Sequence, residues 1–308
     1  MNGKLSIIGA GTMGHSIAFS AAAAGIKTSV WGIDEEDLGR GKTGVREKAE
    51  MLKDNGVITE MEMVRAQSLI SFTTSLEECT AGTSYVIEAA PENLELKQDL
   101  FKNLSELCSK DVILATNTSG LKPTEVAAYA KAPERTIGTH FWNPGHLIPL
   151  VEVVLGEKTA EETVDTTLEL LKKMNKKPIV IKKEILGSIG NRLQYALFRE
   201  AQYILEQGIA SMEDIDAAVK YSIGRRLPVT GPFMTADMGG LDVFHSISDY
   251  LFPDLSKSDK PSSLLTTLKE EGKYGQKTGE GYYQWPASLS KEMSEKREKE
   301  LIYWLKKD

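Results

Sequence analysis

Short apolar runs alternate with longer amphipathic stretches through the first half of the chain. Residues 5–8 form an apolar run that ends at Gly9, as a buried parallel strand does, and residues 13–24 follow as an Ala-rich helix. Further apolar runs predict strands at residues 28–31, 85–87, 112–114, 136–138, 150–154 and 179–181. Helical patterns lie between several of them, at residues 35–69 with a break near Asn55, at 94–107 and at 160–174. This alternation predicts an α/β fold with a doubly wound, mostly parallel sheet that is covered on both faces.

The pattern changes after about residue 183. Apolar residues then recur at helical spacing within residues 189–205, and this stripe consists of Leu193, Ala196, Leu197, Ala201, Ile204 and Leu205. Residues 212–221 predict a second helix, with Ser211 as its N-cap and Asp214 three positions later. Strand patterns do not return, so we expect one domain over residues 1–184 and an all-helical second domain over residues 185–308. The charged tail at 290–308 predicts an amphipathic helix solvated on the surface.

Composition narrows the class of protein. The 308 residues are 41% hydrophobic and 26% charged, which is typical of a globular chain and not of a disordered one. The 44 acidic and 37 basic residues give a net charge of −7, which argues against a nucleic-acid partner. Cys79 and Cys108 are too few for a disulfide framework or a Cys-rich zinc site, and the apolar run 21–24 is too short to cross a membrane. Because the N-terminus opens into a strand pattern without a signal-peptide pattern, we expect a cytoplasmic protein without membrane partners.

A phosphate-binding turn is predicted between the first strand and the first helix. There the chain matches the pattern G-x-G-x-x-G with Gly9, Ala10, Gly11, Thr12, Met13 and Gly14. The first glycine of such a turn permits the tight bend, the second lets a pyrophosphate approach the backbone, and the third permits close helix–strand packing. The N-terminus of the helix adds N–H donors and a partial positive charge. The turn therefore predicts a Rossmann-type domain that binds a dinucleotide.

An acidic stretch after the second strand predicts which dinucleotide is bound. Asp34 lies 20 residues beyond Gly14, the spacing expected of an acid that binds the adenosine ribose. The four consecutive acids at 34–37 would repel a 2′-phosphate, and Arg40 and Lys42 are the nearby cations. NAD is therefore favoured over NADP. An N-cap for the following helix is the alternative role of Asp34.

A histidine and a glutamate are predicted to meet at the sheet. His140 lies at the end of a strand, and the carboxyl ends of strands in such sheets border the ligand crevice. Glu152 interrupts an apolar strand on the same face as Leu150 and Val154, so its carboxylate is expected to be buried and to need a partner. A histidine held by a carboxylate can remove a hydroxyl proton while hydride leaves the same carbon, although a purely structural buried pair is the alternative. We interpret His15, His146 and His245 as surface or packing residues, and no group of side chains has the spacing of a metal site.

Together these residues resemble the 3-hydroxyacyl-CoA dehydrogenase family over nearly the whole chain. The matching segments lie at residues 116–120, 140–144, 150–153, 190–193, 231–233, 240–242 and 277–282. The resemblance implies a dinucleotide-binding domain followed by a helical dimerisation domain, a homodimer, and a role in reactions such as those of fatty acid metabolism. It implies NAD-dependent oxidation of a hydroxyl group β to a carboxyl group or a thioester.

The resemblance also implies roles for single residues. His140 would be the catalytic base and Glu152 the residue that orients it. Ser119 and Asn191 would hold the reacting oxygen, which a hydroxyl and an amide can both do by donating hydrogen bonds. Family contacts to the cofactor fall on Glu92, Lys97, Ser119 and Lys277. A helix N-terminal acid is the alternative for Glu92, and solvated side chains are the alternatives for the lysines.

The chain departs from the family pattern in places that concern the cofactor and the substrate. Counted from Gly14, the family's ribose-binding acid falls on Gly32, and the relatives' CoA-binding Ser and Lys fall on Lys48 and Asn55. Gly120 stands where acyl-CoA relatives repeat Ser, and residues 41–69 hold as many acids as bases. Residues 145–149 and 191–200 are closer to relatives that act on free hydroxy acids, namely gulonate dehydrogenase (lambda-crystallin), carnitine dehydrogenase and a dehydrogenase of vitamin B6 breakdown. An acyl-CoA substrate and a free hydroxy acid both remain open, and a non-enzymatic, crystallin-like role is the third hypothesis.

Overall fold

The computed structural model describes residues 3–307, which divide into two compact units. The first unit consists of the residues up to 189 together with those from 297 onward, and the second consists of residues 190–296. The second unit is thus shorter than the helical domain expected over residues 185–308. The difference arises because the last turns of the C-terminal helix pack on the first unit.

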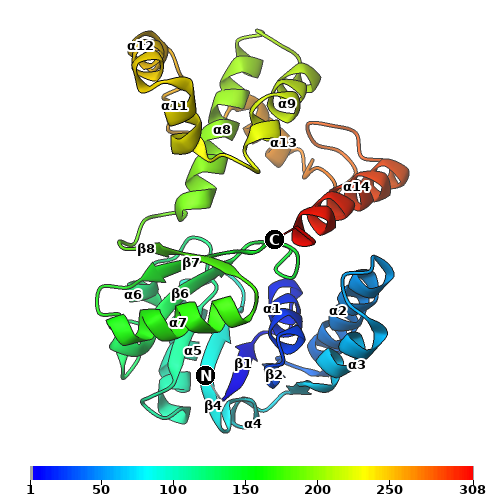
Figure 1. Ribbon diagram of the computed structural model, residues 1–308, viewed down its shortest axis with the longest axis vertical. Helices are drawn as coiled ribbons and strands as arrows, with labels where there is room; N and C mark the ends of the chain where they lie inside the picture. The colour runs from blue at the N-terminus through cyan, green and yellow to red at the C-terminus, as the bar shows by residue number, and fades with distance from the viewer. Residues whose placement is uncertain (1–2, 308) are drawn as a thin grey trace. The chain divides into compact units, whose positions relative to one another are not determined.

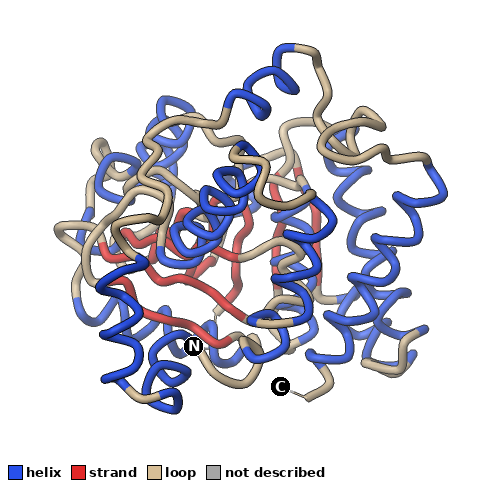
Figure 2. The backbone as a smooth tube through the Cα atoms, turned by 90° about the horizontal axis from the view of Figure 1, so that it is seen from above, coloured by secondary structure: helices blue, strands red, loops and turns tan. Residues whose placement is uncertain are grey.

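The first unit is built on a mostly parallel sheet, as the sequence predicted (Figures 1 and 2). The described part of the chain forms eight strands: β1 (Lys4–Ile8), β2 (Thr28–Trp31), β3 (Ile70–Thr73), β4 (Thr83–Glu88), β5 (Ile113–Thr116), β6 (Thr136–Phe141), β7 (Leu150–Leu155) and β8 (Lys177–Ile181). Their order in the sheet is β3-β2-β1-β4-β5-β6-β7-β8. Neighbouring strands are parallel except β6 and β7, which are antiparallel.

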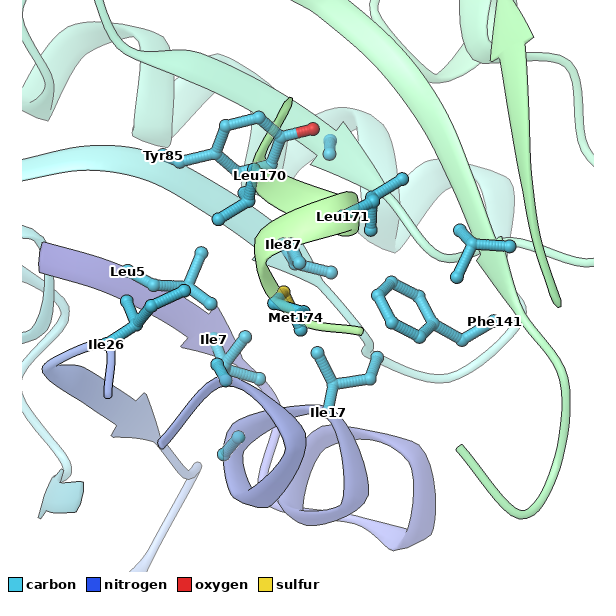
Figure 3. Close-up of a cluster of buried hydrophobic side chains, with 14 of the residues drawn as sticks. Leu5, Ile7, Ile17, Ile26, Tyr85, Ile87, Phe141, Leu170, Leu171 and Met174 are labelled. Carbon is cyan, nitrogen blue, oxygen red and sulfur yellow. The ribbon is translucent and has the colours of Figure 1, made fainter. Parts of the chain in front are cut away.

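Helices cover both faces of this sheet. In the first unit they are α1 (Thr12–Ala23), α2 (Glu35–Asp54), α3 (Glu60–Ser68), α4 (Leu76–Thr80), α5 (Leu94–Leu107), α6 (Pro123–Val126) and α7 (Glu161–Lys173). Alternate residues of β1 point to opposite faces: Leu5 and Ile7 pack against α1 and α7, whereas Ile8 packs against α4, α5 and α6. Figure 3 shows the first of these clusters, where Ile17 of α1 and Leu170 of α7 meet the strands. The helices α2 and α3 form a further layer outside α1.

The edge strand β3 and the short helix α4 were not predicted from the sequence. In β3 the polar Ser71 and Thr73 alternate with Ile70 and Phe72, so the strand has no continuous apolar run. As an edge strand it is only partly buried, and its pairing with β2 is a tertiary contact that a local pattern does not reveal.

The second unit is helical in the part of the chain that the structure describes, as predicted. Its helices are α8 (Ile189–Glu206), α9 (Met212–Tyr221), α10 (Ile223–Arg226), α11 (Pro232–Gly239), α12 (Leu241–Leu251) and α13 (Ser263–Glu270). The predicted cap of α9 is present, because the Asp214 N–H donates to Oγ of Ser211 at 3.1 Å. Isolated β-bridges join Gly275, Glu280 and Gln284.

The C-terminal helix α14 (Ala287–Leu305) is not the fully solvated helix that the sequence predicted. Ile302 is only 4% exposed, and Leu301 and Leu305 also pack on the cluster formed by α1, α2 and α3. Nζ of Lys306 donates a hydrogen bond to the carbonyl of Asn55 at 2.6 Å. The end of the chain is therefore part of the first unit's outer layer.

Candidate active site

The glycine turn lies where the strand order of the sheet reverses, between β1 and β4. Gly9 has φ +115°, and a Cβ on this residue would meet the backbone of Ala89 at 2.8 Å. A Cβ on Gly14 would lie 1.8 Å from the Gly9 carbonyl oxygen, so the helix can approach the turn only with glycine there. The first and third glycines thus have the steric roles that the pattern predicted.

The turn fits the pyrophosphate of a dinucleotide. A Cβ on Gly11 would meet nothing within 4 Å, so the backbone at the second glycine borders open space. No side chain caps the N-terminus of α1 and no acidic residue lies in its first turn. The helix N-terminus therefore presents N–H groups and a positive partial charge to that space.

His140 and Glu152 form the buried pair that the sequence predicted. They are direct partners in the antiparallel register of β6 and β7. Nδ1 of His140 lies 2.7 Å from Oε2 of Glu152, whose residue has no exposed surface. The pair lies at the carboxyl end of β6, at the edge of the sheet that also carries the glycine turn.

Two further donors bind the Glu152 side chain. Nε1 of Trp142 donates to Oε2 of Glu152 at 3.1 Å, and the Ile189 N–H donates to Oε1 at 2.8 Å. With Glu152 as a carboxylate, Nδ1 of His140 donates to it and Nε2 is the nitrogen that can accept a proton. The arrangement can accept a proton at Nε2 and stabilise the imidazolium through Glu152.

A second buried carboxylate, which the sequence analysis missed, lies at the end of β4. Glu88 has no exposed surface and accepts hydrogen bonds from Nζ of Lys97 at 2.7 Å, Oγ1 of Thr116 at 2.6 Å and the Ala90 N–H at 2.6 Å. The signal was present, because an acid directly follows the apolar run 85–87 and a lysine follows nine residues later. Lys97 is only 1% exposed, which excludes the solvated alternative for its side chain. Its assignment as a cofactor contact stays a prediction.

Glu92 shapes the loop after β5. Its Oε1 accepts from Oγ1 of Thr118 at 2.5 Å and from the backbone N–H groups of Ser119 at 3.1 Å and Gly120 at 3.2 Å. Burial opposes its ionisation, but these hydrogen bonds and the charge of Lys97 outweigh burial and lower the pKa of Glu92. An ionised Glu92 therefore holds the loop that carries Ser119, whose contact with cofactor or substrate stays a prediction.

Asn117 links the ends of two strands, a role that the sequence analysis did not assign. Its Oδ1 accepts the Phe141 N–H at 2.8 Å, and its own N–H donates to the Glu88 carbonyl at 2.8 Å. The ends of β4, β5 and β6 are thereby tied together beside His140. Its place between Thr116 and Thr118 at a strand end is the signal that could have identified it.

The other three histidines contact other residues. His15 and His146 are largely buried, and His245 is exposed with Nδ1 at 3.4 Å from Asp249. Nζ of Lys48 lies 2.8 Å from Nε2 of His15, and burial lowers the pKa of both groups. Oγ of Ser16 lies 3.0 Å from Nδ1 of His146, and burial lowers the pKa of His146 to about 3.

The remaining predicted site residues fall at three places. Asp34 is the N-cap of α2, where its Oδ1 accepts the Asp37 N–H at 2.8 Å, as its alternative role required. Asn191 belongs to α8 of the second unit. Lys277 is exposed in the loop after α13. The proposed substrate and cofactor contacts of these residues stay predictions.

Residues 3–307 contain no group of three or more His, Cys, Asp or Glu side chains placed to hold a metal ion. None of the helices among them is long and apolar enough to span a membrane.

The fold and the site define a dinucleotide-dependent dehydrogenase, with a glycine turn at the switch point and a histidine–carboxylate pair at the same edge of the sheet. Family models then specify the class. Residues 4–185 match the 3-hydroxyacyl-CoA dehydrogenase NAD-binding domain, and residues 187–285 match the C-terminal domain of that family. The chain belongs to the 3-hydroxyacyl-CoA dehydrogenase family and is an NAD-dependent oxidoreductase that acts on CH–OH groups.

Relatives fall into two substrate groups. The chain is 34% identical over 299 residues to 5-formyl-3-hydroxy-2-methylpyridine 4-carboxylate 5-dehydrogenase of Mesorhizobium japonicum, which covers 97% of this chain and 96% of that protein. A crystal structure of an enzyme of that name, described as an NAD⁺-dependent dismutase, has a TM-score of 0.91 at 33% identity and covers 98% of this chain and 97% of the other. A crystal structure of (S)-3-hydroxybutyryl-CoA dehydrogenase from Ralstonia eutropha has a TM-score of 0.77 at 32% identity. The match covers 92% of this chain and 99% of the other.

Proposed function

We propose that the protein oxidises a hydroxyl group of a free carboxylic acid and does not require a CoA ester. Nε2 of His140 removes the hydroxyl proton, and Glu152 stabilises the imidazolium that results. NAD, when bound, supplies the hydride acceptor. Ser119 and Asn191 are the proposed donors to the reacting oxygen. A hydrogen bond to this oxygen strengthens as negative charge develops on it in the transition state.

The C-terminal helix carries the proposal for a free acid. Ile302 and Leu305 pack on the outer layer of the first unit, and Lys306 binds the carbonyl of Asn55. By the family resemblance, CoA contacts fall on Lys48 and Asn55. The end of the chain thus lies against Asn55, and the Lys48 ammonium is bound to the buried His15 ring. A CoA phosphate would find neither a clear surface at Asn55 nor an uncommitted cation at Lys48.

The comparisons support the same substrate class. The family model for the helical domain ends at residue 285, before α14 begins at Ala287. The pyridine-carboxylate dehydrogenase covers more of this chain than the 3-hydroxybutyryl-CoA dehydrogenase does, and its TM-score is higher. A relative named for a pyridine carboxylate therefore shares more of this chain's architecture.

A substrate panel tests the proposal. We expect free 3-hydroxy acids and hydroxymethyl or formyl pyridine carboxylates to give a kcat/KM within about 100-fold of 3-hydroxybutyryl-CoA or above it, since about 100-fold corresponds to about 2.7 kcal/mol. A CoA ester preferred by more than about 100-fold across the panel would refute it. Lys48→Ala is the control, because it should not raise KM for the CoA ester selectively unless Lys48 binds a CoA phosphate. Absence of NADH formation with every substrate would instead favour the crystallin-like hypothesis.

We also propose that the chain is a homodimer through its second unit and that it is cytoplasmic. The second unit exposes large apolar side chains, among them Phe233 at 87% and Met238 at 76%, and Cys79 and Cys108 are free thiols. Light scattering at micromolar concentration should give about twice the 33.9 kDa chain mass. Phe233→Asp should shift the mass towards one chain, whereas Met61→Asp, which places a charge at an exposed site of the first unit, should not. A wild-type monomer would contradict the proposal.

A further inference from the structure

The strand β2 ends without an acidic side chain. It ends at Trp31 and is followed by Gly32, near the place where dinucleotide-binding sheets carry the acid that binds the adenosine ribose. Asp34 is exposed, and one of its oxygens already caps α2. The side chain that the sequence spacing favoured is therefore committed to the helix.

The side chain of Leu38 and the carboxylate of Asp37 border the place that a side chain on Gly32 would occupy, with Cδ2 of Leu38 2.5 Å from that Cβ. A Cβ on Gly32 would be 3.0 Å from Oδ2 of Asp37, and this oxygen accepts the Ile33 N–H at 3.4 Å. The Asp37 side chain is only 16% exposed, whereas the neighbouring Glu36 side chain is 84% exposed. Asp37 thus places a carboxylate at the end of β2 from the first turn of α2.

The face of α2 that carries Asp37 packs on the glycine turn. Gly41, one helical turn after Asp37, would place a Cβ 3.0 Å from Cβ of Ala10 and 3.1 Å from its carbonyl oxygen. Gly44 would place one 2.5 Å from the ring of His15, which follows the last glycine of the turn. The helical turns that follow Asp37 therefore lie against the dinucleotide turn.

We propose that Asp37, and not Asp34, accepts the hydrogen bonds of the adenosine ribose hydroxyls of NAD and excludes the 2′-phosphate of NADP. Its Oδ1 is 3.2 Å from Nη2 of Arg40, which also binds Glu36 at 2.6 Å. The contacts described leave acceptor capacity on a carboxylate that has about four lone-pair sites. Because Arg40 is shared by two acids, the strand end keeps a negative charge that favours hydroxyl donors over a phosphate.

Binding measurements on single variants test this assignment. Asp37→Asn should raise the Kd for NADH, followed by its fluorescence, by about tenfold or more, because a hydrogen bond to a charged acceptor is lost. The NADH-over-NADPH preference should fall by a similar factor. Nicotinamide mononucleotide, which lacks the adenosine ribose, should bind the variant and the wild type equally, which shows that the fold is intact.

Two matched variants distinguish Asp37 from the neighbouring acids Asp34 and Glu36. Asp34→Asn keeps a good N-cap and should change the Kd for NADH by less than about threefold. Glu36→Gln removes the same charge from the same helical turn and should also have less than about a threefold effect. Unchanged NADH binding in Asp37→Asn, or a larger loss in Asp34→Asn, would overturn the proposal.

Discussion

Leu104 in α5 and Phe233 in α11 are both large apolar helix residues, yet Leu104 has no exposed surface and Phe233 is 87% exposed. The two compact units differ in the same way. Helices of the first unit bury one face on the sheet, whereas α8 to α13 of the second unit contain no buried residue. The first unit therefore has a packed core of its own on both faces of its sheet. The second leaves apolar surface that a partner surface would have to cover.

The largest expected effect concerns the chemistry assigned to the first unit. His140→Gln should lower kcat by about 10²–10⁴ because the general base is lost, while NADH still binds. His245→Gln, in the exposed part of the second unit, is the control and should leave kcat unchanged. Steady-state kinetics and NADH fluorescence measure both quantities. Turnover near wild type in His140→Gln would show that the pair with Glu152 is only structural.

Truncating one large apolar side chain in each unit sharpens the comparison. Leu104→Ala should lower the free energy of unfolding by about 2–5 kcal/mol at any protein concentration, because it leaves a cavity in a packed core. Phe233→Ala should have an effect that grows with protein concentration, because the proposed dimer would cover this side chain. Urea unfolding over a tenfold or larger range of concentration distinguishes these outcomes. Equal concentration dependence in the two variants would break the comparison.

A smaller effect is expected from pH. Burial lowers the pKa of His146 to about 3 from an ordinary value of 6.5, so between these values the unfolded chain binds one proton more than the folded chain. The stability that the neutral His146 ring contributes is fully present above pH 6.5. It falls by about 1.4 kcal/mol per pH unit below that, which amounts to about 2 kcal/mol by pH 5. His146→Gln should therefore lose about 2 kcal/mol less than wild type between pH 7.5 and 5.0 in urea unfolding. The exposed His245→Gln should keep the wild-type difference, and an unchanged pH response in His146→Gln would contradict the assignment.

The sequence by itself determined the elements whose patterns are local. The Leu5–Ile8 part of β1, the glycine turn, α5 and the capped helix α9 were predicted because apolar spacing, glycine and capping residues act within a few positions. It also determined the pairing of His140 with Glu152, because a carboxylate inside an apolar strand must find a donor.

Only the tertiary structure decided the contacts between distant segments. The strand β3 gains its pairing from β2, Lys97 is buried because it meets Glu88, and Ile302 is buried because α14 returns to the first unit. The acids after β2 show most clearly what sequence spacing cannot predict. Counting residues selects Asp34, whereas the fold places Oδ2 of Asp37 against the Ile33 N–H just beyond the end of β2. Sequence spacing gives distance along the chain, and the direction of a side chain is set by the element against which its helix packs.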